Sequence, residues 1–111
     1  MSRSKIYYSY EIPRTVVDIV KSICADYDRR AIAMRSAPEG ALRIYKYMND
    51  AIDRAMAEIE PAIRRTMLED IYTGRGYDSS PASAIMSRRP YYARKRKAVY
   101  DMALEFQLIS E

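Results

Sequence analysis

Apolar residues that recur every three or four positions constrain the fold of this chain more than any other feature. One face of the first periodic segment carries Val16, Val20, Ile23, Tyr27, Ala31 and Met34. This spacing matches the turn of an α-helix, and no segment shows the strict alternation of a half-buried strand. We therefore predict a helix over residues 13–35, with Pro13 in its first turn.

The same period continues beyond a break at residues 36–40. It predicts a second helix over 41–59, and Pro61 then opens a third helix that ends near Gly74. Ser80 and Pro81 predict a short fourth helix over 81–86, capped by the serine. A fifth helix is expected from Ser87 to about residue 109. Its predicted buried residues are Tyr92, Val99, Met102, Ala103 and Phe106.

These elements predict an all-α fold of about five helices, with a long N-terminal antiparallel helix pair followed by a C-terminal helix-turn-helix. Residues 1–12 are expected to form an arm whose Tyr7, Tyr8 and Tyr10 pack across the helices. Residues 13–111 then form a single helical domain. Within it, 13–60 is the helical hairpin and 61–111 the helix-turn-helix region.

Composition argues against several classes of function. The 111 residues contain no histidine and one cysteine, so the usual general base and the commonest metal ligand are absent. Cys24 lies in an apolar helical run and is expected to be a buried structural thiol. No apolar stretch is long enough for a membrane span, and no signal peptide is evident. We expect a cytoplasmic protein that is not an enzyme and uses neither metal nor cofactor.

The distribution of charge is more informative than the net charge of +4. Residues 88–97 contain six arginines and lysines and no acid. Exposed helices usually interleave acids for pairing across one turn, so an uninterrupted basic run is unusual for a merely solvated face. Such a focused positive patch indicates a phosphate-bearing partner.

A basic helix that follows a tight turn suggests that it enters the major groove of duplex DNA. The side chains expected to face the groove are Arg88, Arg89, Tyr91 and Arg94. Those expected to neutralise flanking phosphates are Lys95, Arg96 and Lys97. Ser87 is expected to cap this helix. Arg96 lies near the edge of the predicted buried stripe, so an ion pair with an acid is an alternative for it.

The residues before the basic helix depart from a standard helix-turn-helix. Ile85 stands where a turn glycine is common, and Pro81 stands where a small alanine usually packs. The turn is therefore expected to be tight, or the first helix to be abbreviated. The DNA prediction also requires the cations of residues 88–97 to be free of the protein's own acids and core.

Two other classes of function fit the same sequence. The chain could be a protein–protein module that acts on a polymerase or another nucleic-acid enzyme. It could instead be a packaging adaptor similar to a small terminase subunit. RNA polymerase and a second copy of the chain are further candidate partners, beside double-stranded DNA.

Four segments carry a resemblance to a known family: residues 52–55, 64–68, 86–98 and 102–109. The most specific is Ser-x-x-x-Tyr-Tyr-x-Arg-Lys-x-Lys-Ala, which begins at Ser87. Together they resemble phage-encoded transcriptional regulators of the ArpU/RinA type, which are similar to the promoter-reading C-terminal domain of sigma factors. The resemblance covers about the C-terminal half. It implies a DNA-binding regulator of phages and mobile elements, with Ser87 as the cap and Arg88, Arg89, Tyr91, Arg94 and Lys95 facing DNA.

Overall fold

The computed structural model of the chain describes residues 12–110, which form five α-helices, two short 3-10 helices and no strand. The α-helices are α2 (Arg14–Ala25), α3 (Tyr27–Ala33), α4 (Glu39–Met56), α5 (Pro61–Thr73) and α6 (Arg88–Glu105). The 3-10 helices are η1 (Tyr77–Ser79) and η2 (Pro81–Ala84). The all-α prediction of about five helices is confirmed. The tyrosines predicted to form a strap, Tyr7, Tyr8 and Tyr10, lie outside the described residues.

Proline and glycine set the ends of α5 as the sequence predicts. Pro61 occupies the first turn of α5, where a backbone N–H would have no acceptor within the helix, so its absence costs no hydrogen bond. Gly74 ends the helix in the left-handed region, with φ of 80°, and donates its backbone N–H to the Asp70 carbonyl at 2.9 Å. A residue with a Cβ would be strained in this conformation, which is why glycine ends the helix here.

The predicted first helix is broken at Asp26 into α2 and α3. Arg30 is buried, and its guanidinium donates to the Ile23 carbonyl at 2.6 Å and to Asn49 Oδ1 of α4 at 2.7 Å. A buried guanidinium needs hydrogen-bond acceptors. The hydrogen bond from Arg30 to the Ile23 carbonyl therefore stabilises the bend between α2 and α3. Asp26 follows the bend and accepts two hydrogen bonds from Arg29.

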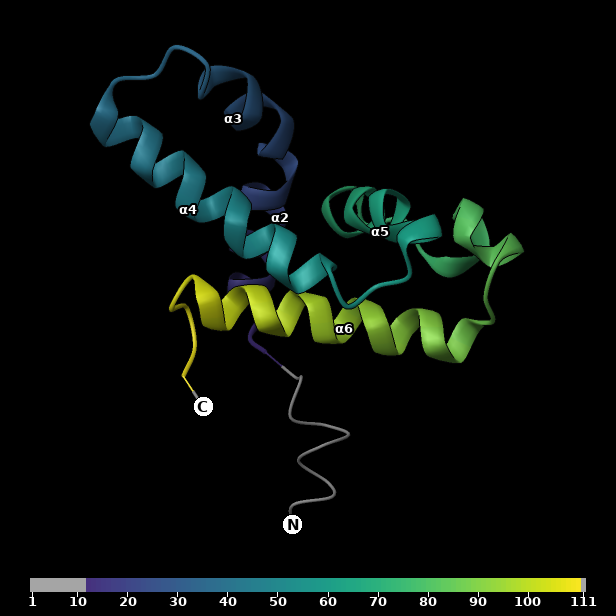
Figure 1. Cartoon of the computed structure of the whole chain (residues 1–111). Coiled ribbons are helices and arrows are strands. Elements are labelled where there is room, and N and C mark those ends of the chain that lie inside the picture. Colours follow the sequence, from purple (N-terminus) through teal and green to yellow (C-terminus); the bar gives the residue numbers. More distant parts are fainter. Residues whose placement is uncertain (1–11, 111) are drawn as a thin grey trace.

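The helices pack around α6, which lies along the base of the molecule (Figure 1). α2 packs against α5 and α6, while α4 packs against α6 and α3. The antiparallel pair of the N-terminal half is therefore formed by α3 and α4, and α2 belongs to the central core. There the Cys24 thiol contacts the Met102 sulfur of α6 at 3.3 Å, and burial raises the pKa of Cys24 to about 12.

α6 ends at Glu105, four residues before the predicted boundary. Gln107 has a left-handed backbone, with φ of 60°. The Leu108 and Gln107 N–H groups donate to the Ala103 and Leu104 carbonyls, both at 2.9 Å, which is a Schellman ending built without glycine. Leu108 and Ile109 then fold against the core. No helix between residues 12 and 110 is long and apolar enough to cross a bilayer.

Candidate nucleic-acid interface

The connection between α5 and α6, residues 74–87, contains less helix than the sequence predicts. The element expected to be an α-helix over 81–86 is the single 3-10 turn η2. Ser80 accepts a hydrogen bond from the Ala82 N–H at 3.1 Å through its side chain, so its predicted capping role is confirmed. Of the two predicted alternatives for the turn, the structure has the abbreviated first helix. With η1 and η2 in place of a full helix, residues 74–87 depend on side-chain contacts for their shape.

Tyr91 is in the core and not on the outer face of α6, so its assignment to the DNA groove was wrong. Its exposed fraction is 0%, and its hydroxyl donates to Asp70 Oδ2 at 2.7 Å. Asp70 is also fully buried and accepts a second hydrogen bond from Arg75 Nε. A buried carboxylate requires such donors, and here α6 provides one through Tyr91 and the turn after α5 provides the other through Arg75. Burial and this hydrogen bond raise the pKa of Tyr91.

Two further tyrosines hold the connection against the start of α6. The Tyr92 hydroxyl accepts from the Tyr77 N–H at 3.0 Å, and the Tyr77 hydroxyl donates to the Met86 carbonyl at 2.7 Å. The Tyr91 ring meets those of Tyr77 and Tyr92 edge to face, at centroid distances of 5.3 and 5.0 Å. These contacts fix the first turns of α6 relative to α5. Tyr92, predicted to be buried, is partly exposed.

Three cations of the basic run form ion pairs within the protein. Arg88 pairs with Asp78 at 2.5 Å and lies over the Tyr77 ring. Arg94 binds Glu60 with three hydrogen bonds of 2.9 to 3.1 Å. Lys97 contacts Glu58 at 3.0 Å and Asp101 at 2.7 Å. Glu58 and Glu60 lie in the connection between α4 and α5 and are more than thirty residues from Lys97 and Arg94, so local spacing could not reveal these two pairs. Asp101, in contrast, is one turn along α6 from Lys97.

Lys95 points into the protein. Its ammonium donates to the Arg75 carbonyl at 2.8 Å and lies 5.4 Å from the centre of the Tyr91 ring. Burial lowers the pKa of Lys95, and the nearby positive charges of Lys21 and Arg75 add to this effect, while Asp70 opposes it. Lys95 therefore belongs with the network around Asp70, which stabilises the connection.

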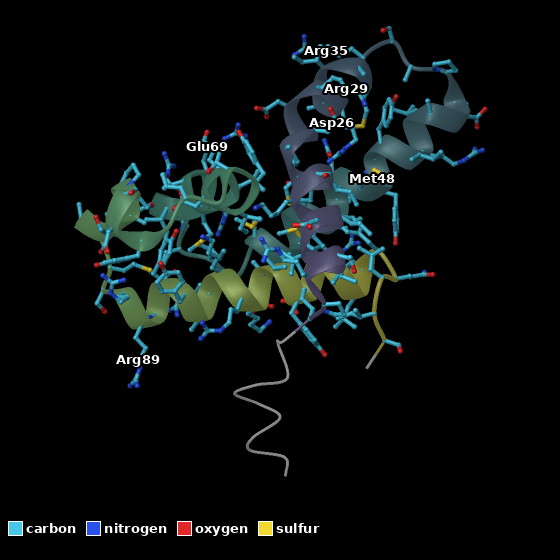
Figure 2. All side chains as sticks on the ribbon, turned by 180° about the vertical axis from the view of Figure 1, so that it is seen from behind. Asp26, Arg29, Arg35, Met48, Glu69 and Arg89 are labelled. Carbon is cyan, nitrogen blue, oxygen red and sulfur yellow. The ribbon has the colours of Figure 1, made fainter. Side chains whose placement is uncertain are left out.

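The condition that the cations of residues 88–97 be free of the protein's own acids and core fails for four of the six. Arg89 and Arg96 are the two that meet it. Both are exposed, and neither forms an ion pair or hydrogen bond with the rest of residues 12–110. Arg89, Ala93 and Arg96 are spaced four and three residues apart, so they form one exposed ridge on the side of α6 that faces away from the core. Figure 2 shows Arg89 pointing away from every other element.

The N-terminal end of α6 adds backbone donors beside this ridge. Ser87 occupies the predicted cap position, but its side chain makes no capping hydrogen bond. The first amides of a helix have no intrahelical acceptor, and they carry the positive end of the helix dipole. Ser87, Arg88 and Arg89 are exposed. The backbone N–H groups at the start of α6 and the two guanidinium groups therefore lie together at one tip of the molecule.

Comparison with known proteins adds no family. No protein-family model, curated protein or solved structure matches this chain. Within residues 12–110, no group of three or more cysteines, aspartates or glutamates is placed to hold a metal ion. The ridge Arg89–Ala93–Arg96, with the tip at Ser87 and Arg88, is thus the candidate interface.

Proposed function

We propose that the protein is a non-enzymatic regulator that binds double-stranded DNA through the exposed ridge of α6. The observation that carries the proposal is the pair of free, exposed arginines, Arg89 and Arg96, on one face of a rigid eighteen-residue helix. The regulatory role rests on the resemblance of residues 86–98 and 102–109 to phage regulators of the ArpU/RinA type.

The charges of the molecule support a polyanionic partner. Each Asp and Glu from residue 12 to residue 110 already contacts a cation, except Asp53, which accepts a hydrogen bond from Tyr27. The positive charges of Arg89 and Arg96 therefore remain uncompensated at the surface. Closely spaced phosphates compensate such charges and release counterions on binding.

The shape of the ridge also suits a groove. Ala93 lies between the two arginines and has a side chain small enough for close approach of a nucleic-acid strand. Arginines on either side of it present planar forks that match guanine edges or phosphate oxygens. Arg88 contributes at the tip, because its pair with Asp78 is largely exposed, at 56% and 76%, and an exposed ion pair is easily exchanged for a phosphate.

Duplex binding by the wild-type chain and by Arg89→Ala/Arg96→Ala tests this proposal. Fluorescence anisotropy with a labelled duplex of mixed sequence, at several salt concentrations, gives the affinity and its salt dependence. We expect the double variant to bind at least about tenfold more weakly at low salt. We also expect its slope of log affinity against log salt to fall by about two, one for each lost phosphate contact.

Arg35→Ala is the matched control. Arg35 is also an exposed arginine that pairs with no described residue, and Figure 2 places it at the opposite end of the molecule from Arg89. At about 0.1 M salt, we expect the loss of this remote charge to change duplex binding by less than about twofold, because charges more than about 10 Å apart are largely screened at that concentration. Equal losses for Arg35 and ridge variants, or no duplex binding by the wild type, would contradict the proposal. Absence of binding would favour the protein–protein alternative.

A further inference from the structure

A row of ion pairs joins α6 to the end of α4 and the start of α5. Glu60 binds Arg94, Glu58 binds Lys97, and Arg54 of α4 binds Glu105 at 2.7 Å. Arg94 and Lys97 belong to the basic run that the sequence assigns to DNA, and both remain partly exposed, at 38% and 40%. Their carboxylate partners are thus in the position that a phosphate would otherwise take.

These pairs differ in kind from the buried pair between Asp70 and Arg75. Asp70 is fully buried, so a polyanion cannot replace it. Glu58 and Glu60 are 63% and 44% exposed, and exposed ion pairs contribute little to stability because water and salt screen them. A phosphate that approaches α6 can therefore compete with Glu58 and Glu60 for the same two cations.

We infer that Glu58 and Glu60 act as intramolecular competitors that set the affinity of α6 for DNA phosphates by occupying Lys97 and Arg94. The inference rests on the proposed function and deepens it, since it assigns an affinity-determining role to two acids outside α6. Its physical basis is the carboxylate pairs at 2.9 and 3.0 Å, in which both partners reach solvent. Binding DNA exchanges each carboxylate for a phosphate, and it leaves the helices packed as before.

Single variants Glu58→Gln and Glu60→Gln test the inference, because glutamine keeps the shape and removes the charge. Glu39→Gln is the matched control: Glu39 is an exposed acid that pairs with Arg43 at 3.2 Å, at the other end of α4. In the duplex anisotropy assay, we expect Glu60→Gln to tighten binding by about three- to tenfold at low salt. Its salt slope should steepen by up to about one, since Arg94 then reaches a phosphate. Glu58→Gln should tighten binding less, though still more than the control, because Asp101 continues to pair with Lys97 at 2.7 Å.

A second arm separates release of Arg94 from a general change in charge. In an Arg94→Ala background, we expect Glu60→Gln to lose most of its gain, because no cation remains for it to release. Thermal melting of every variant checks that the fold is intact. Two results would overturn the inference but leave the proposed function standing, provided that the wild type binds duplex. One is a gain in affinity for Glu58→Gln and Glu60→Gln no larger than that for Glu39→Gln. The other is a full gain for Glu60→Gln in the Arg94→Ala background. If neither the wild type nor the two variants bind duplex, the proposed function fails, and the inference fails with it.

Discussion

The two faces of α6 use the same kinds of residue for different purposes. The inner face has Tyr91 and Lys95 in contact with the turn after α5, where they satisfy buried Asp70 and the Arg75 carbonyl. The outer face has Arg89 and Arg96, which form no ion pair or hydrogen bond within residues 12–110. A charged side chain on a helix is therefore available to another molecule only where the fold gives it no hydrogen bond or ion pair of its own.

The largest expected effect is on stability, from the inner face. Tyr91→Ala removes a fully buried ring that contacts two other tyrosines, and we expect it to lower the free energy of unfolding by about 3–5 kcal/mol. Urea unfolding followed by circular dichroism measures the change. A loss under about 1 kcal/mol would place Tyr91 on the surface, as the sequence alone suggested.

Tyr91→Phe separates the hydroxyl from the ring. It keeps the packing but leaves Asp70 with Arg75 as its remaining side-chain donor. We expect a loss of about 1.5–3 kcal/mol, the usual contribution of a hydrogen bond to a charged group. The same urea titration gives the value, and duplex affinity measured in parallel should stay within about twofold of the wild type. A loss of duplex binding without a loss of stability would reverse the assignment of the two faces.

Alkaline pH should lower the free energy of unfolding through groups buried around the inner face of α6. Burial raises the pKa of Cys24 to about 12, and burial also raises the pKa of Tyr91. The unfolded chain loses these protons at lower pH than the folded chain, so stability is complete below the unfolded values and falls as pH rises toward the folded ones. From pH 8 to pH 10 we expect the thiol to account for about 1–2 kcal/mol of this loss.

Urea unfolding at the two pH values measures this decline, and Cys24→Ala supplies its control. The variant lacks the thiol that packs against Met102, so its stability should depend less steeply on pH. If the wild type is equally stable at pH 8 and pH 10, the buried thiol and hydroxyl do not contribute as described.

The smallest expected effect on stability comes from the outer face. Ala93→Glu and Arg89→Ala change exposed residues of α6, and we expect the free energy of unfolding to change by less than about 0.5 kcal/mol. Duplex affinity should nevertheless fall, because a glutamate at position 93 repels phosphates between the two arginines. A stability loss as large as that of Tyr91→Ala would show that this face is packed against another part of the chain.

Helices with a single buried stripe could be predicted from the sequence. The second and third predicted helices lie within three residues of α4 and α5, because proline and glycine mark their ends. The break at Asp26 could not be predicted, since the apolar period continues across it. It depends on Arg30, which binds the Ile23 carbonyl of α2 and also Asn49 of α4, an acceptor that is in place only once α3 packs on α4.

The site was only partly predictable for a related reason. Tyr91, Ala98 and Met102 follow the helical period as well as Tyr92, Val99 and Phe106 do, so periodicity alone could not decide which tyrosine is buried. The deciding group is Asp70, and aspartates are rarely buried, so the sequence gives little sign of it. The ion pairs of Arg94 with Glu60 and of Lys97 with Glu58 were missed because these acids, in the connection between α4 and α5, are distant in sequence.

An NMR titration of the isotope-labelled chain with a short DNA duplex tests most directly whether the outer face of α6 binds DNA. We predict that the largest shifts fall on the amides of residues 87–96 and on the Arg89 and Arg96 side chains. The Tyr91 hydroxyl contact and the α3–α4 end, including Arg35, should change little. Shifts concentrated on α3 and α4, or no shifts at a duplex concentration of about 1 mM, where even weak non-specific binding would register, would contradict the assignment.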